Sequence, residues 1–584
     1  MSLLVAAIDF GTTYSGWAFS FKHEFESDPT KCSAKNWSGG QLVSMKGPTC
    51  VLINPDGQTL HSFGFDAESK YADLAGEEEH STWYFFRRFK MKLFSQKGVQ
   101  RDAILEGENG KKLPAKRVFS LSIKYLKDDL IKTSNDRISG SAVGEADMHW
   151  VLTVPAIWND AAKQFMREAA QDAGIAGDHL TIALEPEAAS LYCRHLPIEK
   201  SEKSGPEKMS LSSFGPGKRY LVLDAGGGTV DITVHEILPG GRLKELHKAS
   251  GGAWGGTKID DAFYEFMVEI TGTGADIRTK VMDKFKEEHM EDYIDLFRDF
   301  EIKKRAIGPD GDSKVTFKMP VALLTMVQQI RNKTLDEAIK NTKYASDVKS
   351  TSDKLRVNQK VAKGFFDASM RSITNHVKDL LRVPSCRNID AIVMVGGFSE
   401  SPLLQHAIKQ TFSSTQVIIP NEAGLAVLRG AVIFGHKPSM ITSRISKYTY
   451  GTDISPEFDP AKHSFFKGKI DKDGVHRCHG KFSTLVKSGD TLEVGKAQNE
   501  EIYSTVFDEQ EEMGMDIYVA HNKVPEYIDD DGCYRIGTFS VPVSGRGKGR
   551  TVKVRMIFGG TENDVECEEM ATGKITHLLV DCLS

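Results

Sequence analysis

Two stretches of similar pattern decide how this chain folds: LLVAAIDFGTTYSGWAFSF at residues 3–21 and RYLVLDAGGGTVDITVHEI at residues 219–237. In each, an apolar run ends at an aspartate, Asp9 or Asp224, and a glycine-containing turn follows. A second β-prone run comes after each turn. Apolar runs of this length, bounded by glycine, predict strands joined by a tight turn. The sequence therefore predicts strand, glycine turn and strand, used twice.

The residues of these turns suit them for holding phosphate groups. Glycine lets main-chain N–H groups approach an anion because no Cβ is in the way. A carboxylate beside such a turn would repel a bare phosphate, so Asp9 and Asp224 make sense there only with a cation in between. Mg²⁺ fits because it keeps several waters and uses few carboxylates. The two turns thus predict two lobes that grip one nucleotide from opposite sides.

The composition is typical of a soluble globular protein that does not coat nucleic acid. Lys and Arg number 75 against 80 Asp and Glu, which leaves a formal charge of −5 in 584 residues. The eight cysteines form no CxxC pair, so we expect reduced thiols rather than a zinc site or a disulfide framework. The first apolar run is too short for a signal peptide, and no long apolar span follows it. These observations predict a cytoplasmic protein with no membrane span.

A strand–loop–helix pattern accompanies each turn. WVLTVPAIWNDAAKQFMREAAQDAGI at 150–175 follows the first, and IDAIVMVGGFSESPLLQHAIKQTF at 389–412 follows the second. Asn159 or Asp160 is expected to cap the first of these helices. The repeated order indicates an internal duplication, so we expect an α/β region over 1–437 with lobes of about 1–217 and 218–437.

Other segments of the chain differ from this pattern. Residues 197–218 are rich in Ser, Lys, Gly and Pro and are interpreted as a mobile loop inside the α/β region. Residues 258–310 and 330–382 are expected to be mainly helical. From about 448 onward, short β-prone runs alternate with turn signals, so residues 438–584 are predicted to form a separate all-β, sandwich-like domain.

Other nucleotide-binding motifs do not fit. GGAWGGTK at 251–258 has Gly-Thr-Lys where a P-loop needs Gly-Lys followed by Ser or Thr. No G-x-G-x-x-G follows the first strand, which disfavours a dinucleotide-binding fold. The paired turns remain the strongest signal for a ligand.

The motifs resemble those of the actin-like ATPases, and within them the 70-kDa heat-shock family. AIDFGTTYS and LVLDAGGGTVDITV are similar to its two phosphate motifs, LTVPAIWNDAAKQ to a connecting segment, and IVMVGGFSESP to its adenosine motif. LEPEAAS and PNEAGLAVLRGAV also match, in the family's order. The divergence of the chain and SRISKYTYG point to the heat shock 70 kDa protein 12 subfamily. The resemblance implies two ribonuclease-H-like lobes.

The resemblance also implies roles for individual residues. Asp9 and Asp224 would hold Mg²⁺ through water, and Glu185 would orient the metal's waters or the attacking water. Asp231, Thr229 and a lysine complete the implied catalytic set; FFRRFKMKLF offers Lys90 or Lys92, and we choose Lys90. The residues implied to bind ATP or ADP are Gly11, Thr12, Thr13, Tyr14, Gly226, Gly227, Gly228, Thr229, Gly255, Gly256, Glu301, Lys304, Arg305, Gly396, Gly397 and Glu400.

The chain departs from the family at several of these places. Phe398 and Glu400 stand in the adenosine motif where the family has Ser and Arg, so the base contacts should change. Asn421 replaces an aspartate, and Lys163 replaces an arginine that acts as a switch in the family, whereas Pro155 is kept. FGHKPSMITSRISK replaces the family's leucine-rich linker, and we expect no helical lid after the β domain.

Three functions follow as hypotheses. The first is a chaperone-type protein that binds Mg²⁺ with ATP or ADP, hydrolyses ATP slowly, and carries a β domain for client or signalling proteins. The second is a nucleotide-sensing scaffold with negligible hydrolysis, favoured by Glu400 and the missing linker. A third, weaker alternative is a kinase of sugars or polyols from the same superfamily, which the β-rich C-terminal part disfavours.

Overall fold

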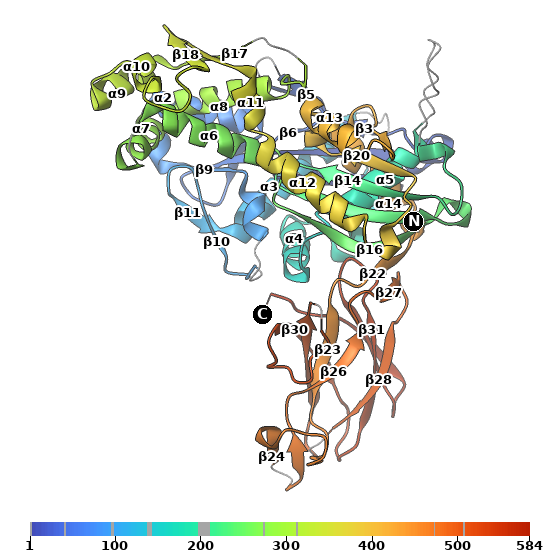
Figure 1. The fold of residues 1–584 in the computed structure, drawn as a ribbon. Coiled ribbons are helices and arrows are strands. Elements are labelled where there is room, and N and C mark those ends of the chain that lie inside the picture. The colour runs from blue at the N-terminus through green and yellow to red at the C-terminus, as the bar shows by residue number, and fades with distance from the viewer. Residues whose placement is uncertain are drawn as a thin grey trace.

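The computed structural model describes residues 3–39, 42–94, 99–136, 143–196, 211–272, 275–310, 314–471, 474–505, 508–521 and 523–583. Figure 1 shows a broad part built of helices and sheets, with a narrower part made of strands below it. Most of the predicted mobile loop, residues 197–210, lies outside the described ranges.

The first glycine turn joins two strands at the centre of a sheet. Strand β1 (Leu4–Phe10) pairs antiparallel with β2 (Tyr14–Phe21), as the sequence predicts. On its other side β1 pairs parallel with β12 (Met148–Val154), and β12 pairs parallel with β13 (Leu180–Leu184). The sheet order is β13-β12-β1-β2-β3, with β3 at Ser33–Ala34 and β6 (Gly47–Pro48) also paired to β2. All seven residues of β1 are buried, which explains its unbroken apolar run.

The second glycine turn lies at the centre of a second sheet with the same arrangement. Strands β14 (Arg219–Ala225) and β15 (Val230–Ile237) pair antiparallel. Strand β14 pairs parallel with β20 (Ala391–Val395), and β20 with β21 (Gln416–Ile418). With β16 (Leu243–Gly252) beside β15, the order β21-β20-β14-β15-β16 repeats that of the first sheet. The repeated topology agrees with the duplication that the sequence predicts.

Helices fill the space between the two sheets and cover their outer faces. Helices α5 (Glu185–His195) and α14 (Ala426–His436) share one core cluster with residues of both sheets, so they lie between them. Helices α3 (Ala115–Asp136) and α4 (Asp160–Asp172) pack on the outer face of the first sheet. Asn159 caps α4 by accepting the main-chain N–H of Ala162 at 2.9 Å, as predicted. Helices α6 (Thr257–Thr271), α12 (Asp367–Leu380) and α13 (Pro402–Thr411) cover the second sheet.

The remaining elements of the α/β region are shorter or peripheral. The helices are α1 (Lys22–Ser27), α2 (Phe65–Gly76), α7 (Ala275–Glu288), α8 (Met290–Lys304), α9 (Val321–Arg331), α10 (Leu335–Ile339) and α11 (Gln359–Gly364). The strands are β4 (Trp37–Gly39), β5 (Leu42–Ser44), β7 (Cys50–Ile53), β8 (Leu60–Phe63), β9 (Tyr84–Arg87), β10 (Ile104–Glu106), β11 (Lys112–Pro114), β17 (Val315–Lys318), β18 (Val348–Thr351) and β19 (Lys354–Val357). Strands β18 and β19 form a hairpin inside the segment expected to be mainly helical. Their alternating buried and exposed residues give a strand period there.

After the α/β region, the chain forms two four-stranded sheets. One has the order β26-β23-β29-β30 and the other β28-β31-β32-β33. Their strands are β23 (Thr449–Ile454), β26 (Lys481–Val486), β28 (Asn499–Ser504), β29 (Glu512–Ala520), β30 (Cys533–Pro542), β31 (Thr551–Ile557), β32 (Asp564–Glu569) and β33 (Lys574–Leu579). Strands β24 (Gly468–Ile470) and β25 (His476–Cys478) form a separate two-stranded hairpin. Apolar residues from both sheets form one core cluster, so the sheets face each other.

This β-rich part is joined to the second sheet of the α/β region by strands. Strand β22 (Ile441–Ile445) pairs parallel with β16, and β27 (Thr491–Glu493) pairs antiparallel with β22. The junction is visible in Figure 1 below β16. The expected boundary at residue 438 therefore stays a prediction, because the sheet continues past it into β22.

Polar contacts fasten the β-rich part to helix α5 and to the start of α4. Arg444 on β22 makes two bonds of 2.7 Å to the carboxylate of Glu187 on α5. The ammonium of Lys447 donates to the main-chain carbonyl of Ile157 at 2.7 Å, and the Tyr450 hydroxyl donates to Asp160 at 3.0 Å. The junction is thus held by buried charges as well as by strand pairing.

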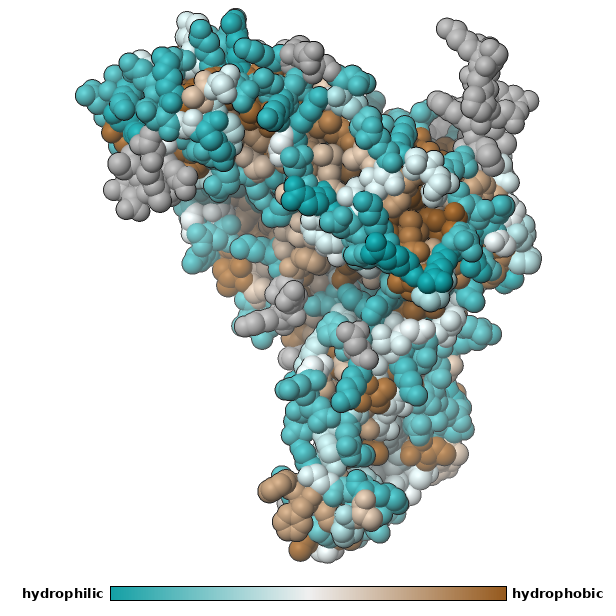
Figure 2. Space-filling view, in the orientation of Figure 1, coloured by the Kyte–Doolittle hydropathy of each residue, from teal (hydrophilic) through white to brown (hydrophobic). Residues whose placement is uncertain are grey.

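Figure 2 shows one face of the molecule, where apolar side chains appear among hydrophilic ones, including at the far end of the β-rich part. Three exposed apolar residues lie in and next to the β24–β25 hairpin there: Phe465, Phe466 and Ile470. None of the helices in the described ranges is both long and apolar enough to cross a lipid bilayer.

We predict that Arg444→Met destabilises the protein by about 3–5 kcal/mol, because it leaves the buried Glu187 carboxylate without its partner. Urea unfolding followed by tryptophan fluorescence measures the change. The double variant Arg444→Met/Glu187→Leu should regain part of the loss. Arg535→Met, which removes an exposed ion pair with Asp516, is the matched control and should change little. A single variant as stable as the parent would contradict the structural role of the pair.

Candidate functional site

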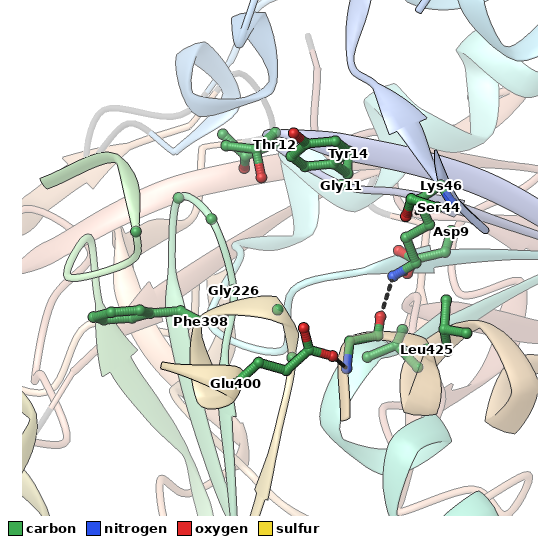
Figure 3. A pocket seen from close by; sticks show the side chains of 18 of the residues that line it. Asp9, Gly11, Thr12, Tyr14, Ser44, Lys46, Gly226, Phe398, Glu400 and Leu425 are labelled. Atoms are coloured by element: carbon green, nitrogen blue, oxygen red, sulfur yellow. Dashed lines mark hydrogen bonds and ion pairs between the residues drawn. The ribbon is translucent and has the colours of Figure 1, made fainter. Parts of the chain in front are cut away.

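The two glycine turns face a single cavity of about 610 Å³ between the two sheets. This volume lies within the range of small-molecule sites, about 300–1,000 Å³. Figure 3 shows side chains from both halves pointing into it, among them Asp9, Thr12 and Tyr14 from the first half and Phe398 and Glu400 from the second. The shared cavity is what the paired turns predict.

The two turns approach each other so closely that side chains are excluded. A Cβ at Gly227 would overlap the side chain of Thr13, and a Cβ at Gly228 would lie 2.5 Å from the Thr12 hydroxyl. Glycine is therefore required at both positions for steric reasons. Threonine hydroxyls from one lobe and bare main chain from the other line the same end of the cavity.

The predicted glycine pair at 255–256 supports the second turn from behind. The N–H of Gly255 donates to Gly228 O at 3.1 Å, and the N–H of Gly256 donates to Gly226 O at 3.1 Å. Gly256 lines the cavity, whereas Gly255 does not. Instead, a Cβ at Gly255 would lie 2.5 Å from Gly227 O, so this glycine permits the close approach of the α6 start to the turn.

Three predicted carboxylates line the cavity at the ends of strands. Asp9 is the next-to-last residue of β1, Asp224 is the next-to-last residue of β14, and Glu185 is the first residue of α5. Burial raises the pKa of Asp224 well above its usual value, and the neighbouring Glu185, Asp231 and Asp9 raise it further. Burial also raises the pKa of Glu185 to about 7, although Lys90 opposes this. The crowding of carboxylates makes a positive charge favourable at this place.

Lysine 90 provides one such charge. Its ammonium lies 2.7 Å from Glu185 Oε1, and its side chain is almost fully buried in the short helix η2 (Phe89–Leu93). Lys92, the alternative considered from the sequence, is exposed. The structure thus places Lys90, and not Lys92, beside the predicted catalytic glutamate.

Asp231 does not line the cavity, although the family resemblance places it among the catalytic residues. It lies opposite Asp224 in the β14–β15 pair and is buried. Its carboxylate accepts the main-chain N–H of Ile157 at 2.9 Å. Asp231 therefore contacts the loop before α4, while the neighbouring Thr229 lines the cavity.

The donor set fits a hydrated divalent cation. Asp9 and Asp224 come from different lobes and both line the cavity, so their carboxylates can hold such a cation through water, as Mg²⁺ prefers. Within the described residues, no group of three or more His, Cys, Asp or Glu is arranged to ligate a metal directly.

The other end of the cavity is formed by α8 and by the loops that follow β20 and β21. Glu301, Lys304 and Arg305 of the predicted set all line it. Lys304 bridges Glu301 at 2.5 Å and Asp260 of α6 at 2.6 Å, which holds α8 in place. The Arg305 guanidinium lies 5.3 Å from the ring centroid of Tyr14, across the cleft.

The adenosine-like motif continues this end. Gly396 has φ of +84° beside Asp224, and the short helix η8 (Gly397–Glu400) follows it. Phe398 stacks on Phe366 with ring centroids 6.4 Å apart. Glu400 accepts the N–H of Gly424 at 3.0 Å (Figure 3). Both residues that depart from the family pattern thus line the cavity. Phe398 forms part of an apolar wall, and Glu400 holds the loop that contains Gly424.

Several lining residues were not among those predicted to bind the nucleotide, although two of them lie in the PNEAGLAVLRGAV stretch. They come from the segment between β3 and β6, from the position before α12 and from the loop after β21: Asn36, Val43, Ser44, Met45, Lys46, Phe366, Glu422 and Leu425. The most consequential is Lys46, whose ammonium lies 2.5 Å from Asp9 Oδ2. It stands in SMKGPTC, which matches no motif. Only the pairing of β6 with β2 brings it to the site.

Comparisons with known proteins agree with this geometry. A family model described as "Hsp70 protein" matches residues 86–439. Heat shock 70 kDa protein 12A of Mus musculus is 33% identical over 633 residues, spanning all of this chain and 92% of the relative. The human protein of that name is 32% identical with the same coverage. Human heat shock 70 kDa protein 12B is 32% identical over 640 residues, spanning 91% of that relative.

The family model begins after the first glycine turn, but the three relatives extend over it. With two sheets of repeated topology around one cleft and similarity along its entire length, the chain belongs to the Hsp70 family.

Proposed function

We propose that this protein binds ATP and ADP with Mg²⁺ in the cleft between its lobes and hydrolyses ATP slowly. One observation carries the proposal: two glycine turns from different sheets face one cavity that is lined by buried carboxylates of both lobes. Bare main chain and threonine hydroxyls suit phosphate oxygens. The carboxylates suit a cation rather than the phosphates themselves.

Each part of the polyphosphate site has residues of suitable chemistry. Thr12, Thr13 and the Gly226–Gly228 turn would hold the phosphates, and Asp9 and Asp224 would hold Mg²⁺ through water. When bound, Mg²⁺ supplies charge neutralisation. Phosphoryl transfer needs positioning and charge stabilisation more than covalent chemistry, so these groups suffice.

Glu185 is the residue best placed to orient and deprotonate an attacking water. Its pKa of about 7 makes it a proton acceptor near neutral pH. Lys90, at 2.7 Å, fixes its carboxylate and lies 5.1 Å from the centroid of Trp158. Lys90 therefore acts as a positioning residue for Glu185.

The base would lie at the α8 end of the cavity. Phe366 and Phe398 supply an apolar wall, and Glu301, Lys304 and Arg305 supply polar groups beside it. The Glu400 carboxylate accepts the N–H of Gly424, so we propose that it shapes the loop rather than contacting the base.

A sugar or polyol kinase is a weaker candidate because no sugar-binding segment is evident.

A second candidate function is nucleotide sensing with negligible turnover. The observation that favours it is the ion pair between Lys46 and Asp9, which occupies a proposed metal-holding carboxylate. In this case the cleft would bind nucleotide and the β-rich part would contact protein partners. The exposed Phe465 and Phe466 at its far end support a role in chaperone-type contacts.

All eight cysteines are free, which supports a cytoplasmic location.

We predict that Mg·ADP raises the melting temperature, because a ligand at about 100 times its Kd adds about 2.7 kcal/mol to the free energy of unfolding. Differential scanning fluorimetry with ADP, ATP and GDP measures the shift. Gly228→Val, which overlaps Thr12 in the cleft, should remove it. If neither the adenine nucleotides nor GDP changes the melting temperature, nucleotide binding is contradicted.

We predict that Glu185→Gln retains ADP binding but lowers single-turnover ATP hydrolysis by about 10²-fold or more, the usual contribution of a general base. Phosphate release with excess protein over ATP measures the rate. Glu236→Gln, at a partly exposed ion pair with Arg219 outside the cavity, is the matched control and should hydrolyse as the parent does. Saturable binding by the parent without phosphate release over hours would instead favour the sensing function.

A further inference from the structure

Lys46 is a cation built into the cleft by the fold of the first lobe. It lies between β5 and β6, directly before Gly47. Strand β6 pairs with β2 at Tyr14↔Pro48 and Ser15↔Gly47. Thr49, next in the chain, donates its N–H to Thr13 O and its hydroxyl to Gly11 O, both at 2.8 Å. The segment that carries Lys46 is therefore bonded to the first glycine turn itself.

The ammonium of Lys46 joins the two lobes across the cavity. It lies 2.5 Å from Asp9 Oδ2 in the first lobe and donates to Gly424 O in the second at 2.7 Å. The N–H of Gly424 in turn donates to Glu400. Figure 3 shows this line of contacts from Asp9 through Lys46 to Glu400. It runs from the expected phosphate end of the cavity to the expected base end.

Three of the carboxylates that line the cleft already have a lysine partner. Lys90 pairs with Glu185 and Lys46 pairs with Asp9 at the phosphate end, and Lys304 pairs with Glu301 at the other end. In the described part of the chain, Asp224 forms no ion pair. Lys46 and Asp9 are both mostly buried, with 14% and 5% of their side chains exposed, so their attraction is weakly screened.

We propose that Lys46 provides part of the positive charge for the nucleotide's phosphates and competes with Mg²⁺ for Asp9, so that nucleotide affinity depends only weakly on the metal. This inference rests on the proposed nucleotide binding and refines its metal requirement. An ammonium has three N–H donors, and Asp9 and Gly424 use two, which leaves one for a phosphate oxygen. Lysine binds phosphate as a compact point charge.

The competition follows from like-charge repulsion. A hydrated divalent cation held by Asp9 would lie close to the Lys46 ammonium, and two cations at one carboxylate disfavour each other. Removing the Lys46 charge frees Asp9 for the metal and removes a charge-assisted bond from the phosphates. The variant should therefore bind nucleotide poorly without Mg²⁺ and regain affinity with it.

Isothermal titration with ADP, in Mg²⁺ and in EDTA, tests this for the parent, Lys46→Met and Lys46→Arg. For the parent we expect affinities within about threefold of each other in the two conditions. For Lys46→Met we expect at least about a tenfold loss in EDTA, the usual effect of losing a charge-assisted bond, and recovery in Mg²⁺. Lys46→Arg keeps the positive charge, so its affinity in EDTA should lie closer to that of the parent than the affinity of Lys46→Met does.

Lys35→Met is the matched control, because Lys35 comes from the same part of the chain and pairs with Asp129 outside the cavity. It should bind ADP as the parent does in both conditions. If the parent binds ADP about tenfold or more tightly in Mg²⁺ than in EDTA, the inference is overturned, whether or not Lys46→Met folds. Equal metal dependence of the parent and Lys46→Met also overturns it. A parent that binds no ADP in either condition would instead refute the proposed function.

Discussion

The close approach of the two glycine turns is the constraint on which the rest of the site depends. Gly227 and Gly228 lie against Thr13 and Thr12 with no space for a Cβ. The start of α6 fixes the second turn through three main-chain bonds, from the N–H groups of residues 255, 256 and 257. Because both turns are fixed by main-chain contacts, the carboxylates at their strands are brought into one buried space.

That burial places several negative charges close together, and two lysines from outside the glycine turns compensate for them. Several carboxylates in one apolar setting repel one another, and burial without a counter-charge is costly. Lys90 and Lys46 lie at Glu185 and Asp9 and reduce this cost. The same two lysines then define what the cavity can accept, since an anionic ligand meets ammonium groups already in place.

One of the connections between the site and the β-rich part runs through Ile157. The N–H of Ile157 donates to Asp231, behind the cleft, and the carbonyl of the same residue accepts from Lys447, which follows β22. Strand β22 itself extends the second sheet. A movement of the loop before α4 would therefore change the hydrogen bond to Asp231 behind the cleft and the hydrogen bond from Lys447 of the β-rich part.

Sequence patterns predicted those features that depend on local order. The two strand–turn–strand units, the cap at Asn159 and the glycine and threonine residues of the turns follow from apolar runs, helix signals and the absence of side chains. The roles of Gly255 and Asp231 could not be predicted from sequence patterns. Both belong to the expected motifs, yet they support neighbouring main chain instead of lining the cavity, because their contacts depend on how α6 and the loop before α4 pack.

Local sequence patterns were enough to predict the paired hairpins, the duplicated α/β pattern and the acidic residues near the strand ends, since periodicity and glycine over a few residues set these features. The contacts of Lys46 with Asp9 and Gly424, the burial of Lys90 and the pairing of β22 with the second sheet became visible only in the folded molecule. Those contacts link residues far apart in the chain. Their partners are chosen by packing and strand pairing, which no local pattern encodes.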